Sequence, residues 1–114
     1  MTPAAFRKLA LSLGGATEGA HGGHADFRAG GKVFASLGYP GKDWGMVKLM
    51  PEQQQMLVSA EPAIFVPVKG TWGLRGATSV RLGEADARTM LSALTMAWQN
   101  VLAPKARKAR RRAA

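Results

Sequence analysis

Cysteine is absent from the 114-residue sequence, and this excludes disulfide bridges, cysteine nucleophiles and thiolate metal sites. Long apolar runs are absent as well, because no stretch approaches the roughly 20 residues of a membrane-spanning helix. The segment 1–15 carries basic residues inside its apolar stretch, which is typical of an amphipathic helix rather than a signal peptide. We therefore expect a cytoplasmic protein with no membrane partner.

Acidic residues are scarce, with seven Asp and Glu against 16 Lys and Arg, for a net charge of +9. The last ten positions contain no acid at all. Their six basic residues are Lys105, Arg107, Lys108, Arg110, Arg111 and Arg112. We expect one domain over residues 1–104, followed by a disordered basic tail over 105–114. Tails of this kind bind polyanions, of which nucleic acid is the commonest in a cell.

Helical signals occur three times along the chain. Thr2 and Pro3 are a good N-cap and first position for a helix that Gly14 would end. Pro51 starts a second predicted helix, which extends to Ala60. The longest predicted helix covers residues 84–102, with an apolar stripe. The stripe consists of Leu91, Leu94, Trp98 and Val101.

Strand signals are concentrated between His24 and Leu49. The runs HADFR, KVFASL and WGMVKL are separated by Ala-Gly-Gly and by GYPGKD, both of which favour turns. Residues 16–23 fit either a short edge strand or a loop. Residues 71–74 and 78–82 predict a second hairpin around Arg75-Gly76.

Alternation of side chains along a strand predicts two different faces for the 24–49 meander. The core face would consist of Phe27, Val33, Ala35, Leu37, Val47 and Leu49. The other face would consist of His24, Asp26, Arg28, Lys32, Phe34, Ser36, Trp44, Met46 and Lys48. A basic sheet face that carries aromatic rings is the main indication of function in this sequence.

The order of these elements predicts an α+β fold, a two-layer sandwich in which an antiparallel sheet of about five strands has helices on one face. Several segments also match a known pattern, in the order GHADFRAGGKVFASLGYP, WGMVKL, PEQQ, Pro67-Val68, Trp72-Gly73, Ala97-Trp98 and Ala103-Pro104-Lys105. They resemble the MmcQ/YjbR family over nearly the whole chain up to about Lys105. The resemblance implies a YjbR-like, secretion-chaperone-like sandwich and a DNA-binding label. Met50, where the family usually has a capping Thr, and the long basic tail depart from the family pattern.

Nucleic-acid binding is the function that the charge layout favours. Arg28, Lys32 and Lys48 would project from one sheet face, with Arg81 as a neighbour if the second hairpin joins that edge. Lys42, Lys69 and Arg75 would lie near hairpin tips, and Trp44 and Trp72 would stack on bases. The alternative for Phe34, Trp44 and Met46 is a place in the core beneath a helix. No helix offers a row of base-reading residues, so we expect non-specific binding to DNA or RNA.

Other functions have weaker support in the sequence. Glu18, His21, His24 and Asp26 are residue types that ligate metals, but their spacing matches no established motif. A structural role for the same residues is the alternative, with Asp26 paired to Arg28 or Lys32, or Glu18 holding His21. No nucleophile elbow or phosphate-binding loop is present, so we predict neither an enzyme nor a cofactor. Apolar residues on the sheet face would also suit a protein partner, and the chain would be a monomer or a homodimer.

Overall fold

The computed structural model describes residues 1–102 of the chain. Its strands form one antiparallel sheet in the order β1-β2-β3-β4-β6-β5. The elements are α1 (Pro3–Leu11), β1 (Thr17–His21), β2 (His24–Ala29), β3 (Lys32–Leu37), β4 (Trp44–Lys48), α2 (Pro51–Ala60), β5 (Phe65–Pro67), α3 (Thr71–Leu74), β6 (Ala77–Arg81), the 3₁₀ helix η1 (Leu82–Glu84) and α4 (Ala87–Leu102).

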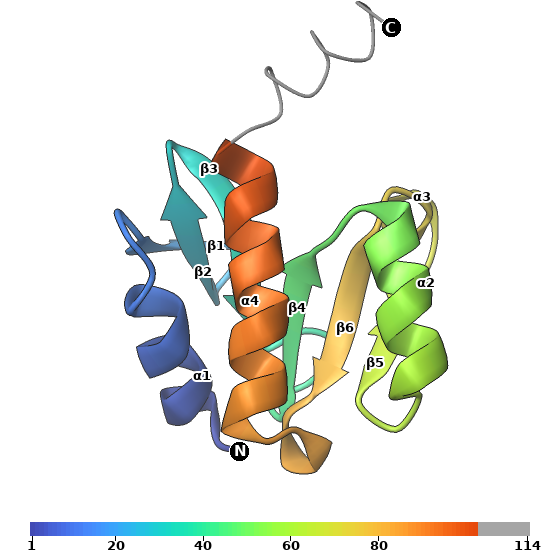
Figure 1. Cartoon of the computed structure of the whole chain (residues 1–114). Coiled ribbons are helices and arrows are strands. Elements are labelled where there is room, and N and C mark those ends of the chain that lie inside the picture. Colours follow the sequence, from blue (N-terminus) through green and yellow to red (C-terminus); the bar gives the residue numbers. More distant parts are fainter. Residues whose placement is uncertain (103–114) are drawn as a thin grey trace, which may run out of the picture.

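Helices α1, α4 and α2 lie on one face of this sheet (Figure 1). Helix α4 packs across β2, β3 and β4, α1 packs against α4 and β4, and α2 packs against β5. The α+β two-layer sandwich expected from the sequence is therefore confirmed. The sheet has six strands because residues 17–21 form an edge strand and residues 65–67 pair with β6.

The predicted hairpin around Arg75-Gly76 is wrong, because Thr71–Leu74 forms the helical turn α3 and β6 pairs with β4 and β5. Two glycines allow the backbone to pack closely here. A Cβ on Gly73 would lie 1.6 Å from the Val68 carbonyl oxygen, and one on Gly76, where φ is +113°, would lie 1.9 Å from that of Leu49. The strand-like composition of Thr-Trp-Gly-Leu is thus overridden by tertiary packing.

The core lies between the sheet and α4. Helix α4 buries Met90, Ala93, Leu94 and Ala97. Of the predicted stripe, Leu94 is buried and Trp98 and Val101 pack against the core, whereas Leu91 is 38% exposed and its predicted place in the stripe is wrong. Burial of side chains such as Phe27 and Leu94 supplies about 1.5–3 kcal/mol each. Asp86 caps α4 by accepting a hydrogen bond from the Thr89 amide, 2.7 Å away, so that helix begins later than residue 84.

A β-bulge changes the predicted faces of β3. Phe27 pairs with Ala35 but Arg28 pairs with Val33, so Phe34 is an extra residue on β3. Because of the extra residue, Lys32 and Val33 face the opposite sides of the sheet from those that simple alternation predicts. Phe34 is a fully buried core residue instead of part of the basic face. Val33 moves opposite Arg28, outside the core cluster. Lys32 pairs with the core residue Ala29, so it leaves the face that carries Arg28.

Candidate nucleic-acid interface

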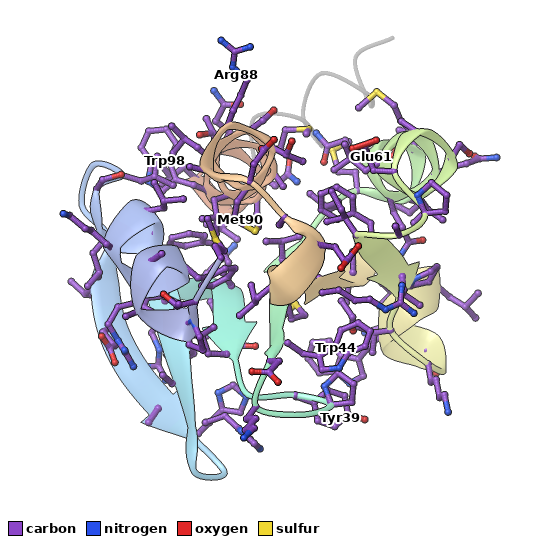
Figure 2. The ribbon with its side chains drawn as sticks, turned by 90° about the horizontal axis from the view of Figure 1, so that it is seen from below. Tyr39, Trp44, Glu61, Arg88, Met90 and Trp98 are labelled. Atoms are coloured by element: carbon purple, nitrogen blue, oxygen red, sulfur yellow. The ribbon has the colours of Figure 1, made fainter. Side chains whose placement is uncertain are left out.

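The sheet face opposite α1, α2 and α4 is called the open face here. Register pairs place its central row side by side across four strands, from Asp26 through Ser36 and Met46 to Ser79. The other members of the open face are Arg28, Trp44, Lys48 and Arg81. Figure 2 shows Trp44 and Tyr39 at this side of the molecule, with Arg88 of α4 at the opposite side. The open face is therefore the sheet face on which the sequence predicts the binding site.

Two cations of the open face lie against indole rings. The Lys48 Nζ is 5.2 Å from the centre of a Trp72 ring, and the Arg81 Cζ is 5.0 Å from the centre of a Trp44 ring. Trp44 and Arg81 are opposite each other in the β4–β6 ladder, whereas Trp72 comes from α3. Such cation–π contacts contribute about 0.5–1 kcal/mol at exposed sites.

The charges of Lys48 and Arg81 are not cancelled by an acid. Burial lowers the pKa of Lys48 from its ordinary value, because desolvation disfavours the ammonium form. The Arg81 guanidinium donates to the carbonyl oxygens of Pro62 and Ala63, at 3.4 and 3.3 Å, which fixes its position without neutralising it. Among residues 1–102, neither cation has an ion-pair partner. Both are therefore available to an anion.

Arg28 is also on the open face, but its charge is compensated by a buried carboxylate. Its Nε donates to Asp26 Oδ1 at 2.8 Å and its Nη2 to Asp26 Oδ2 at 3.0 Å. The His21 Nδ1 is 2.7 Å from the same Oδ2. The hydrogen bond from Arg28 lowers the pKa of Asp26 to about 2, against the opposing effect of burial and with added help from His21. The pairing of Asp26 with Arg28, one of the alternatives left open by the sequence, is thus confirmed.

Gly19 provides the space for this cluster. It lies opposite Asp26 in the β1–β2 ladder. A Cβ at this position would be 3.0 Å from Asp26 Oδ1 and 3.2 Å from Arg28 Cζ. A side chain on β1 would therefore push against the carboxylate or the guanidinium, so glycine keeps the ion pair in place.

The remaining predicted cations lie outside the strand rows of the open face or outside the described residues. Lys42 is exposed in the turn before β4, Lys69 is exposed after β5, and Arg75 is exposed at the end of α3 rather than at a hairpin tip. Lys32 lies on the opposite face, as the bulge requires. Lys105, Arg107, Lys108, Arg110, Arg111 and Arg112 lie outside the described residues.

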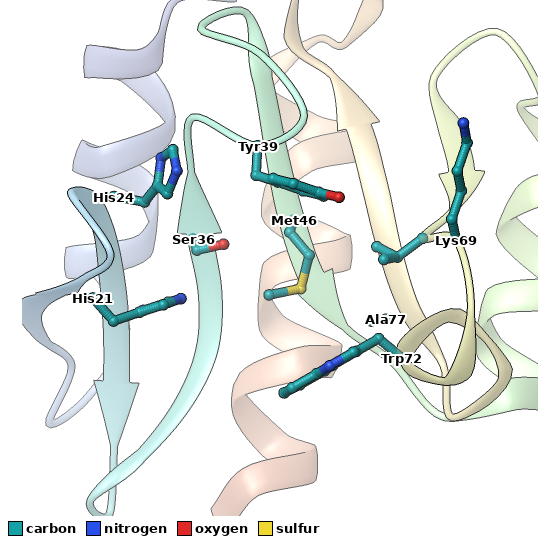
Figure 3. Close-up of a pocket in the computed structure, with 9 residues that line it drawn as sticks. His21, His24, Ser36, Tyr39, Met46, Lys69, Trp72 and Ala77 are labelled. Atoms are coloured by element: carbon teal, nitrogen blue, oxygen red, sulfur yellow. The ribbon is translucent and has the colours of Figure 1, made fainter.

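A pocket of about 360 Å³ is set into the open face (Figure 3). Ser36 and Met46 come from the central row of the sheet, and Tyr39 and Trp72 contribute aromatic rings. His21, His24 and Lys69 complete its polar edge. The pocket could not be predicted from the sequence, because it forms only when the helical turn α3 packs against β6 and the 38–43 turn brings Tyr39 to the same side.

The possible metal ligands do not assemble. Glu18 pairs with Phe27 in the ladder and so faces the helix layer, where Arg7 Nε donates to its Oε1 at 3.0 Å. Asp26 is occupied by Arg28 and His21. The structure shows no group of three or more His, Asp or Glu side chains fit to hold a metal within residues 1–102.

None of the helices between residues 1 and 102 combines the length and the apolar composition needed to span a bilayer.

The chain was compared with protein families, curated proteins and solved structures. Searches of curated proteins and of solved structures found nothing similar to this chain. The model of the YjbR family matches residues 11–100, which extends from the end of α1 to near the end of α4 and includes the whole sheet. The resemblance stated from the sequence is therefore confirmed, and the chain belongs to the YjbR family.

Proposed function

We propose that this protein binds DNA through the open face, without strong sequence preference and without a catalytic step, in the cytoplasm. The observation that carries the proposal is the pair of uncompensated cations, Lys48 and Arg81, each seated on an indole ring of a sheet face that α1, α2 and α4 leave uncovered. Cations bind phosphates, and aromatic rings stack on bases or sugars. One surface therefore offers both kinds of contact.

The electrostatics of the open face favour an anion. The pKa of Lys48 is lowered because water has been removed from its ammonium group, and a phosphate oxygen beside it would replace the lost solvation. The buried carboxylate of Asp26 is matched by Arg28, so it does not repel a phosphate strongly. Glu18 lies on the other side of the sheet, against Arg7.

We expect a weak sequence preference because the described residues contain no helix suited to contact base edges in the major groove. Sequence-specific recognition commonly places a helix with Arg, Asn or Gln side chains in the major groove. Helix α2 does carry glutamines, but it has no cation to hold phosphates, and Gln53 and Gln54 are engaged within the protein. Phosphate contacts therefore dominate the proposed interface.

The basic tail is proposed to add affinity that does not depend on the open face. Truncation after residue 104 removes six cations, so we expect weaker binding to duplex DNA and a shallower dependence on salt. Both effects should appear in a salt titration that compares the truncated and full-length chains. An unchanged salt slope would contradict the role of the tail.

The role of the open face is tested by paired charge removal in the full-length chain. The double variant Lys48→Ala/Arg81→Ala removes the two ring-seated cations. The control variant Lys8→Ala/Arg88→Ala removes two exposed cations from α1 and α4 on the helix side, so the net charge is the same in both.

We expect the open-face variant to weaken DNA binding roughly tenfold at low salt and to lower the salt slope by about 2, at roughly 0.9 per phosphate contact. The control should change neither quantity much. Fluorescence anisotropy of a labelled duplex over a salt series measures both. Equal losses in the two variants would mean that only net charge matters and would contradict the proposed interface.

A protein partner is the second candidate, and exposed apolar side chains favour it. On α3, Trp72 is 61% exposed and Leu74 is 81% exposed. An apolar interface between two copies would give a mass near twice 12.1 kDa and little response to salt. Sedimentation equilibrium at low and high salt separates this outcome from a monomer that binds DNA.

A further inference from the structure

We propose that the pocket of the open face receives the base of an unpaired nucleotide, so that the protein prefers single-stranded to duplex DNA. This inference rests on the proposed function and adds the form of DNA that the site takes. It starts from the shape of the pocket. The volume of about 360 Å³ lies near the lower end of the roughly 300–1,000 Å³ typical of ligand pockets.

The walls of the pocket suit a flat aromatic ligand. Tyr39 and Trp72 lie on either side of Met46 in the close-up view (Figure 3). Both residues are more than half exposed, and because Lys48 lies over one face of Trp72, the other face of that ring is the one left for a ligand. Base stacking on aromatic side chains is a common basis of single-strand binding, and the Met46 thioether makes favourable contacts with ring edges.

The polar groups at the other side of the pocket can bond to the edge of a base. The Ser36 hydroxyl can both donate and accept a hydrogen bond, and it belongs to the sheet rather than to a mobile loop. The Nδ1 of His21 is engaged by Asp26, so its Nε2 is the nitrogen left for a ligand. The Asp26–Arg28 pair therefore holds the imidazole in a defined orientation at the pocket edge.

The charges around the pocket suit the phosphates that flank a base. Lys69 lines the pocket, and Lys48 lies over the Trp72 ring that forms its wall. Among residues 1–102, the carboxylate that is hydrogen-bonded to a lining residue is Asp26, whose two oxygens are already hydrogen-bonded. A stacked base pair cannot enter a pocket of this kind, since a base must first leave the stack. Unpaired DNA avoids that cost.

The test compares three DNA ligands at one salt concentration: a single-stranded oligonucleotide, the same strand with abasic sites, and its duplex. The abasic strand keeps the phosphates and loses the bases, so it separates pocket binding from charge. We expect the intact strand to bind about fivefold to a hundredfold more tightly than the abasic strand, as one stacked base would give. The duplex should bind less tightly than the intact strand, because its bases are paired and stacked.

Two variants test the pocket directly. Trp72→Leu removes a stacking ring from an exposed position, and Met46→Trp fills the pocket while keeping every cation. Each should abolish the preference for the intact strand over the abasic strand, because the base then has no ring or no room in the pocket. Leu74→Ala, at an exposed position that does not line the pocket, is the matched control on the same helix and should keep the preference.

The outcomes separate this inference from the proposed function. Equal binding of intact and abasic strands by the natural chain would overturn the base pocket and leave DNA binding in place. Failure to bind any of the three ligands at low salt would overturn the proposed function itself. Free dAMP that competes as strongly as the oligonucleotide would also overturn the inference, because a strand would then not be the ligand.

Discussion

The two faces of one sheet differ more than the pattern of any single strand indicates. On the helix-covered face, Phe27, Ala35 and Val47 are neighbours in the ladder and are fully buried. On the open face, the next residues along the same strands are Asp26, Ser36 and Met46. The first row forms the core under α4, and the second lines a pocket or holds an ion pair. Alternation alone thus separates the stabilising half of the sheet from the proposed binding half.

The comparison of the two faces also shows how residues of the open face are shielded from solvent without a covering layer of long helices. Asp26, Ser36 and Ser79 are buried although no long helix lies over them. Arg28 covers the first of these through its ion pair, and α3 with Trp72 covers the region near β6. Short segments and long side chains therefore replace a helix layer here, and they leave a pocket between them.

The largest expected contrast is in stability. Phe27→Ala removes a ring that packs against Phe6, with ring centres 6.0 Å apart, and should lower the free energy of unfolding by about 3–5 kcal/mol. Met46→Ala, on the same sheet but on the open face, should cost less than about 1.5 kcal/mol because Met46 is only partly buried. Urea unfolding monitored by circular dichroism measures both. Similar losses of unfolding free energy in the two variants would contradict the conclusion that the covered face stabilises the fold more than the open face does.

Much of the covered face could be predicted from the sequence, because helix starts, turns and alternation are local signals. Pro3, Pro51 and the turns of the 24–49 segment located most elements, and their order specified the α+β class. The bulge at Phe34 could not be predicted in this way. A single inserted residue leaves no mark in a run such as KVFASL, yet it moves Phe34 into the core and Lys32 to the other face.

The open face was harder to predict because its contacts join distant segments. Arg81 reaches Trp44 through the β4–β6 ladder, and Trp72 reaches Lys48 through a helical turn that the sequence indicated as a strand. The pocket depends on Tyr39, which the sequence placed in a turn without a binding role. The ion pair of Asp26 with Arg28 could be predicted from the sequence, since residues two apart in a strand share a face.

A smaller effect is expected at Asp26, whose carboxylate is buried on the open face. Asp26→Asn keeps the size of the side chain but removes the charge that holds Arg28 and His21. A pKa lowered from 3.8 to about 2 corresponds to about 2 kcal/mol of stability at neutral pH. The same variant leaves the Arg28 charge uncompensated, so its affinity for DNA should rise while its stability falls.

The pH dependence of this difference has a defined sign. The folded-state pKa lies below the unfolded value, so the contribution of Asp26 is fully present above pH 3.8 and is lost as the pH falls toward 2. The stability gap between the natural chain and Asp26→Asn should therefore be widest near neutral pH and should close in acid. Asp43→Asn, at an exposed turn position, is the control and should show little gap at any pH. A gap that stays constant down to pH 2 would contradict an ionised Asp26.

The smallest effect on stability, and the one that best separates stability from binding, is expected at Lys48. Lys48→Met keeps an unbranched chain against Trp72 and removes an ammonium group whose pKa burial has lowered. Because that shift means that the charged form is disfavoured in the folded state, the substitution relieves a desolvation cost, which opposes the loss of the cation–π contact. We expect the free energy of unfolding to change by less than about 0.5 kcal/mol, while DNA affinity falls. Paired urea unfolding and anisotropy titrations measure the two quantities, and a clear loss of stability with unchanged affinity would mean that Lys48 serves the fold and not the proposed interface.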